Sequence, residues 1–236
     1  TPSSDVEDAT NVMTLATSYT DTAGNAGPGA TTANYQVDTV RPTVASFTMS
    51  DTALISGETS TVTLQFSEAV ASFSSDDDIT VQNGSLATMT SSDNITWTGT
   101  FTPSSDVEDA TNVLTLATSY TDTAGNAPAS TSTTDNYTVD TTAATVVAFT
   151  LSDSALKIGD TATVTLQFSE AVASFSSSAD ITVENGSLAT MTTTDNITWT
   201  GTFTPSSDVE DATNVMSLAT SYTDTAGNAG PSATTD

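Results

Sequence analysis

The sequence predicts an all-β protein made of tandem two-sheet sandwiches. A stretch that begins PSSDVEDATNV and ends SYTDTAGNA occurs three times, at residues 2–26, 103–127 and 205–229. The copies are spaced by roughly one hundred residues, which is the size of one sandwich domain. Between the copies, apolar residues alternate with Thr and Ser, as they do in half-buried strands. Together the repeat length and the alternation of period two predict the fold class.

The repeats divide the chain into three parts. Residues 1–40 match the C-terminal part of a repeat, residues 41–141 form a complete repeat, and residues 142–236 form a repeat without its last strand. The linkers at residues 37–39 and 139–141 are short, which leaves little room for a flexible hinge. We therefore expect domains that are joined end to end.

Seven segments of the complete repeat read as strands because they alternate or are bounded by turn residues such as Asn83-Gly84. They are Val44–Ser50, Thr61–Phe66, Ile79–Val81, Leu86–Thr90, Ile95–Phe101, Val113–Tyr120 and Asn136–Val139. Seven antiparallel strands are the count of an immunoglobulin-like sandwich. The expected core is Val62, Leu64, Phe66, Ile79, Val81, Ile95, Trp97, Phe101, Leu114, Leu116, Tyr137 and Val139.

The charge balance excludes several classes of partner. The chain has 29 acidic residues against two basic ones, and its formal net charge is −27. Such a chain cannot neutralise phosphates, so nucleic acid is excluded, and no apolar run is long enough for membrane insertion. A folded state with this charge repels itself, which favours bound cations.

The residue types also argue against an enzyme. The chain has no cysteine and no histidine, so thiol nucleophiles, zinc sites and the usual acid-base catalysts are missing. Paired carboxylates recur in every repeat, whereas a glycosidase needs one pair within a cleft. Trp97 and Trp199 lie in mid-strand and are expected in the core, so no exposed aromatic platform for carbohydrate is found. We expect no catalytic residues.

Two acidic clusters flank one short strand in each copy. In the complete repeat, Asp106, Glu108 and Asp109 precede the strand, and Asp122 and Asn126 follow it. A strand of about seven residues at about 3.3 Å per residue holds the two clusters about 20 Å apart, at opposite poles of the domain. When domains follow one another, the pole of one repeat that carries Asp106, Glu108 and Asp109 faces the pole of the next repeat that carries the equivalents of Asp122 and Asn126.

This arrangement predicts calcium sites where repeats meet, because calcium takes six to eight oxygen ligands from carboxylates, amides and carbonyls. In the first expected site, Glu7, Asp8 and Asp38 face Glu68, Asp122 and Asn126; in the second, Glu108, Asp109 and Asp140 face Glu170, Asp224 and Asn228. The alternative is that these residues are solvated and simply make turns. That alternative applies best to Asp5, Asp106 and Asp208, which precede the main clusters.

Several motifs resemble the bacterial Ig-like repeats of large secreted surface adhesins, including RTX-type adhesins of biofilms. They are Ile55-Ser56-Gly57-Glu58, Leu64-Gln65-Phe66-Ser67-Glu68-Ala69-Val70, Trp97-Thr98-Gly99-Thr100-Phe101, Tyr120-Thr121-Asp122-Thr123-Ala124-Gly125-Asn126 and Asn136-Tyr137-Thr138-Val139-Asp140-Thr141. The resemblance covers essentially the whole chain. It implies calcium between domains and an extracellular extender arm that projects a terminal binding domain.

Two functions are compatible with these features. The first is a calcium-stiffened extender of a surface adhesin, whose partners are the neighbouring repeats of the same chain. The second is a subunit of an extracellular fibre, sheath or surface layer, in which the segment 34–38 of one molecule completes the open sheet of an identical molecule by strand addition.

Overall fold

The computed structural model describes residues 1–235 and confirms the predicted all-β class, with 41% of residues in strands and 3% in helices. Contacts between residues divide the chain into two units. Unit 1 consists of Thr1–Asp51, Ser60–Phe101 and Val113–Asn136, and unit 2 consists of Thr52–Thr59, Thr102–Asn112 and the chain from Tyr137 onward. These units cut across the repeats 1–40, 41–141 and 142–236, whose boundaries therefore stay a prediction.

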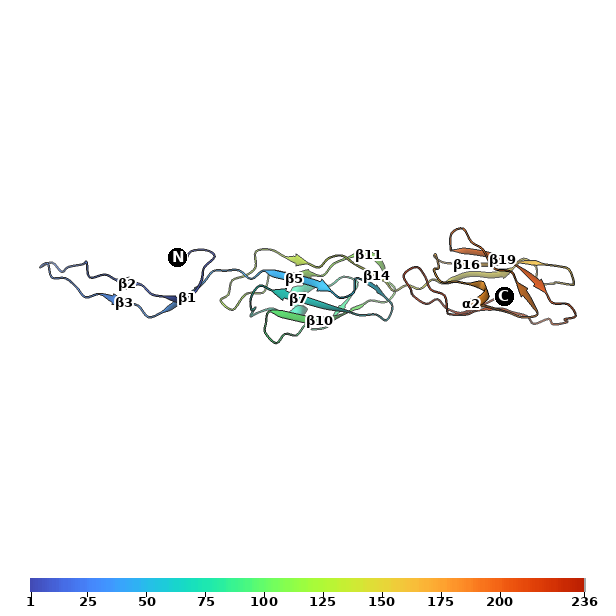
Figure 1. Ribbon diagram of the computed structural model, residues 1–236, viewed down its shortest axis with the longest axis horizontal. Coiled ribbons are helices and arrows are strands. Elements are labelled where there is room, and N and C mark those ends of the chain that lie inside the picture. The colour runs from blue at the N-terminus through green and yellow to red at the C-terminus, as the bar shows by residue number, and fades with distance from the viewer. Residues whose placement is uncertain (236) are drawn as a thin grey trace. The chain divides into compact units, whose positions relative to one another are not determined.

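Unit 1 contains four groups of paired strands. Its elements are β1 (Glu7–Asn11), β2 (Thr14–Leu15), β3 (Ala30–Thr31), β4 (Tyr35–Asp38), β5 (Val44–Met49), β7 (Ser60–Phe66), α1 (Ser75–Asp78), β8 (Ile79–Thr80), β9 (Gly84–Leu86), β10 (Thr96–Pro103), β12 (Thr115–Leu116) and β13 (Ser132–Thr133). β5, β7, β10 and β9 form one sheet, and β13, β12 and β8 form the facing sheet (Figure 1). β1 pairs with β4, and β2 pairs with β3, in two separate two-stranded sheets.

The core of unit 1 lies between the two larger sheets. Val62, Leu64 and Phe66 alternate along β7 with at most 1% exposure, as the period of two predicts. Phe66 packs edge-on against Phe73, with ring centroids 5.5 Å apart. Trp97 also packs edge-on against Phe73, with ring centroids 4.9 Å apart, and is half-buried, which agrees with a core role.

Unit 2 repeats the same architecture. Its elements are β6 (Ala53–Ile55), β11 (Glu108–Asn112), β14 (Tyr137–Asp140), β15 (Val146–Leu151), β16 (Ala162–Phe168), α2 (Ser177–Asp180), β17 (Ile181–Val183), β18 (Gly186–Leu188), β19 (Thr198–Pro205), β20 (Met216–Leu218) and β21 (Ala233–Thr234). β15, β16, β19 and β18 form one sheet, and β17, β20 and β21 form another. Their facing sides bury Phe149, Leu166, Phe168 and Tyr222. A third sheet places β14 between β11 and β6.

The count of seven strands was wrong, because ten strands, β5 to β14, lie within residues 41–141. The acidic segment between the expected strands Ile95–Phe101 and Val113–Tyr120 forms the strand β11, which pairs antiparallel with β14 and places Glu108 opposite Asp140. The residues between the expected strands Val44–Ser50 and Thr61–Phe66 contain β6, which pairs parallel with β14. Of the expected core, Val81, Ile95 and Trp97 are only half-buried, and the others are buried.

Candidate metal centre

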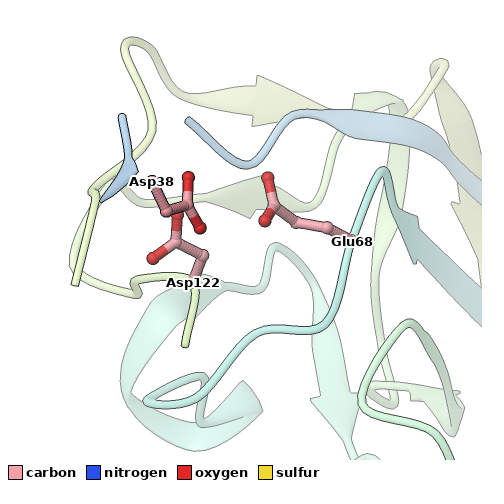
Figure 2. Close-up of side chains that lie close together, drawn as sticks. All are labelled: Asp38, Glu68 and Asp122. Atoms are coloured by element: carbon pink, nitrogen blue, oxygen red, sulfur yellow. The ribbon is translucent and has the colours of Figure 1, made fainter. Parts of the chain in front are cut away.

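Three carboxylates from distant parts of the sequence meet in unit 1. Asp38 is the last residue of β4, Glu68 follows the buried strand β7, and Asp122 lies in the loop after β12. One carboxylate oxygen of each lies within 4.8 Å of the other two (Figure 2). Asp122 is buried, and Asp38 and Glu68 are half-buried. We call these three residues together with Glu7 cluster 1, because Glu7 of β1 lies opposite Asp38 in the hairpin.

The local sequence around Asp122 fixes that carboxylate in place. Its Oδ1 accepts hydrogen bonds from the backbone N–H groups of Ala124, Gly125 and Asn126 at 2.7 to 2.9 Å. Gly125 has φ +97°, which explains why glycine stands at this position of the turn. Burial acts to raise the pKa of Asp122, but hydrogen bonds from the Asn126 side chain and from these backbone groups outweigh burial and lower the pKa. Asp122 is thus held in its ionised form.

Asn126 contacts two members of cluster 1 through its side-chain amide nitrogen. Its Nδ2 donates to Oδ2 of Asp122 at 2.8 Å and to the backbone oxygen of Asp38 at 3.3 Å. The expected ligand Asn126 therefore lies in the right place but presents donors to its neighbours.

The pKa of Glu68 is shifted in the opposite direction to that of Asp122. Partial burial raises the pKa of Glu68, and the negative charges of Asp122, Asp38 and Glu7 raise it further. Each of these effects disfavours the ionised form of Glu68 when no cation is near. A bound cation would instead favour the ionised form of Glu68, since a positive charge stabilises a carboxylate.

Asp8 lies outside cluster 1, although the sequence predicted it as a ligand. Its Oδ1 accepts hydrogen bonds from the backbone N–H and the hydroxyl of Thr10. Successive residues of a strand point to opposite faces, so Glu7 and Asp8 cannot both face Glu68. Asp109 makes the same contacts with Thr111 in β11.

Unit 2 contains the equivalent group of carboxylates, which we call cluster 2: Glu108, Asp140, Glu170 and Asp224. Burial and the charges of Asp224, Asp140 and Glu108 raise the pKa of Glu170. Glu108 lies opposite Asp140 in the ladder of β11 and β14.

Asn228 positions cluster 2 as Asn126 does in cluster 1. Its Nδ2 donates to the backbone oxygen of Asp140 at 3.0 Å and to Oδ2 of Asp224 at 2.9 Å. Its side-chain oxygen accepts a hydrogen bond from the backbone N–H of Ser56. The sequence did not predict the contact with Ser56, because nothing in the pattern links residues so far apart.

The sequence reasoning also missed Arg41. Its Nη1 donates to the backbone oxygen of Ala127 at 2.8 Å and so tethers the end of the loop that carries Asp122. The signal available was that Arg41 is one of only two basic residues in an acidic chain.

The donor set of cluster 1 fits a hard divalent cation. All its members are carboxylates, which are the ligands that calcium prefers. Two oxygens that bind one calcium ion at about 2.3 to 2.6 Å lie at most about 5 Å apart. The spread of 4.8 Å among the three nearest oxygens meets that limit. Without histidine or cysteine, the chain has no ligands that favour zinc or copper.

The comparison with protein families agrees with the fold. A family model described as bacterial Ig-like domain matches residues 38–139 and 140–236. A search of curated proteins gave no significant match. Among solved structures, a crystal structure of the I9-I11 tandem from titin is similar at 9% identity and a TM-score of 0.27, and covers 80% of this chain. This chain spans 64% of that titin chain.

Proposed function

Because the chain belongs to the bacterial Ig-like domain family, we propose that it is an extender segment of a secreted bacterial surface adhesin, stiffened by calcium. Domains of this family are usually found on extracellular surface proteins and are typically structural rather than enzymatic. No helix within residues 1–235 is long and apolar enough to cross a membrane. The proposed role is to hold a binding domain away from the cell for adhesion or biofilm formation.

The meeting of Asp38, Glu68 and Asp122 is the observation that carries this proposal. Asp38 ends the last strand of one predicted repeat, and Glu68 and Asp122 lie in loops of the next. An ion that binds all three would restrict rotation about the linker that follows Asp38. Glu7 would add a fourth carboxylate, and cluster 2 would act in the same way at the next linker. Asn126 and Asn228 would hold the carboxylates in position.

Extracellular calcium sites bind with dissociation constants of about 10⁻⁴ to 10⁻³ M. Such sites are filled outside the cell and empty in the cytosol, so the chain would stiffen after secretion. Without calcium, the carboxylates within each cluster repel one another, and each linker is expected to bend.

Small-angle scattering of this chain in millimolar calcium and in chelator tests the proposal. We expect the maximum dimension and the radius of gyration to rise with calcium. The double variant Asp38→Asn/Asp140→Asn should lose most of that response. The matched control is Asp77→Asn/Asp135→Asn, which removes two negative charges at exposed residues outside both clusters. Scattering that is identical with and without calcium, together with no heat of binding in calorimetry, would overturn the proposal.

A further inference from the structure

Two segments that lie far apart in the sequence meet within unit 2, and they belong to different matches of the family model. Turn 55–58 begins at the last residue of β6 and lies in the match of residues 38–139. Loop 224–228 carries a member of cluster 2 and lies in the match of residues 140–236. A contact between the two segments therefore joins neighbouring domains at a point other than the covalent linker.

The geometry of turn 55–58 leaves one backbone donor available for this contact. The N–H of Glu58 donates to the backbone oxygen of Ile55 at 3.2 Å, which closes a four-residue turn. Gly57 at the third position has φ +84°, and Ser56 at the second position has a negative φ, which is the combination found in a type II turn. The N–H of the second residue makes no bond inside such a turn, so it needs a partner elsewhere.

Asn228 is that partner. Its Oδ1 accepts the hydrogen bond from the N–H of Ser56 at 3.0 Å, and the residue is only 4% exposed. Its Nδ2 is occupied by the bonds to Asp140 and Asp224, so both polar atoms of the amide are bonded. A buried acceptor that loses its donor costs free energy, which makes separation of the two segments unfavourable.

Ile55 adds an apolar contact with the same loop. Its Cδ1 lies 3.6 Å from the position that a Cβ at Gly227 would occupy, which is an ordinary contact distance. The parallel ladder of β6 and β14 places Ile55 beside Asp140, the last residue of β14. Pairing with β14 thus brings turn 55–58 to the end of the strand from which the chain enters the next domain.

We propose that turn 55–58 is a docking element that binds loop 224–228 of the following domain and restricts rotation about the linker after Asp140 without calcium. The groups in contact are a backbone N–H, an amide oxygen and an apolar side chain, all of which are neutral. Repulsion between carboxylates therefore acts against this contact only indirectly, and salt does not screen it. In chelator, this linker is expected to bend less than one that is restrained by carboxylates alone. The contact forms whether or not cluster 2 holds an ion.

Hydrogen exchange of the Ser56 amide, followed by NMR in chelator, tests the contact itself. We expect Asn228→Ala to speed this exchange by about 2- to 10-fold, which corresponds to the loss of one hydrogen bond. The matched control Asn126→Ala removes the equivalent side chain at cluster 1 and should leave the rate unchanged. An equal rate in the native chain and in Asn228→Ala would overturn the proposal.

A second variant removes the donor and keeps the turn. Ser56→Pro places proline at the second position of a type II turn, where it is favoured, and the preceding Ile55 already lies in a strand, as proline prefers. The matched control Ile158→Pro makes the same change in the equivalent turn, which is closed by a hydrogen bond from Asp160 to Lys157 at 3.0 Å. Within residues 1–235, the N–H of Ile158 makes no hydrogen bond.

Distance distributions between two spin labels measure rotation about the linker. The labels are attached to cysteines introduced at Thr98 and Thr200, which are exposed and equivalent positions of β10 and β19, since the chain has no cysteine of its own. In chelator, we expect Ser56→Pro to widen the distribution and Ile158→Pro to leave its width unchanged. A width in Ser56→Pro equal to that of the native chain, or equal widening by both proline variants, would overturn the proposal.

Discussion

Single carboxylates in cluster 1 have opposite effects on stability. The pKa of Asp122 is lowered, so its contribution to folding is present above the pKa of the unfolded chain and is lost as the pH falls. The pKa of Glu68 is raised, first by burial and then by its acidic neighbours. The folded state therefore holds the proton of Glu68 more tightly than the unfolded state does. Its ionised form costs stability at neutral pH, and this cost disappears as the pH falls below the ordinary range of a glutamate.

We predict that Glu68→Gln stabilises the calcium-free chain at pH 7. The gain is expected to be up to about 1 kcal/mol, the size typical of exposed charge interactions. In chelator, the Tm of the repeat that contains Glu68, which is about one hundred residues long, should rise by about 4 to 8 °C per kcal/mol. The rise should vanish near pH 4, where the native Glu68 is protonated, and it should reverse in calcium because a ligand is lost.

Thermal unfolding followed by circular dichroism at pH 4 and pH 7 measures these effects. Asp135→Asn serves as the control for net charge, since it makes the same change of one unit at an exposed site. A loss of stability for Glu68→Gln in chelator at pH 7 would contradict the electrostatic account of this residue.

Strands with long regular alternation could be predicted from the sequence, and two short strands, β6 and β11, could not. β7 and β10 alternate over seven and eight residues, so their pattern is visible without the structure. β6 has three residues and β11 has the polar sequence EDATN, and both exist because β14 offers them its two edges. Pairing with a distant strand overrides local preference in these two cases.

The sequence also predicted part of the candidate site but not the features that depend on residues far apart in the chain. Repeats and acid-rich turns predicted that Asp38, Glu68 and Asp122 would meet. They could not exclude Asp8, whose direction depends on which face of β1 is turned to the neighbouring loops. Nor could they show that Asn126 donates its amide hydrogens, because that depends on where Asp38 and Asp122 lie.

Within β10, Gly99 is required by close approach of a neighbouring segment. A Cβ at this position would lie 2.8 Å from the backbone oxygen of Ala87 and 2.9 Å from Cγ of Met89. We predict that Gly99→Ala destabilises its sandwich by about 1 to 3 kcal/mol, the usual cost of overpacking. Thr98→Ala, at the exposed neighbouring position, should cost less than half as much. Urea unfolding monitored by tryptophan fluorescence measures both, and equal costs would contradict the steric explanation.

For the whole molecule, uncompensated negative charge is the dominant electrostatic feature. The net charge is −27, and within residues 1–235 the only ion pair joins Lys157 and Asp160 at 3.3 Å. Most carboxylates therefore have no cationic side chain near them. Self-repulsion of this kind weakens the folded state and is reduced by bound cations or by screening salt.

Specific calcium binding and general charge screening by salt should affect the stability of the whole chain differently. A site that binds calcium only in the folded state adds about 2.7 kcal/mol at a calcium concentration of one hundred times its Kd. Scanning calorimetry should then show Tm rising with the logarithm of calcium concentration in the millimolar range, with no plateau. Magnesium at equal ionic strength should have a smaller effect, because it requires a tighter octahedral arrangement of ligands. The variant Asp38→Asn/Asp140→Asn should respond to calcium only as the native chain responds to sodium chloride. If calcium, magnesium and sodium chloride at matched ionic strength raise Tm equally, the carboxylate clusters do not form specific sites and charge screening alone stabilises the chain.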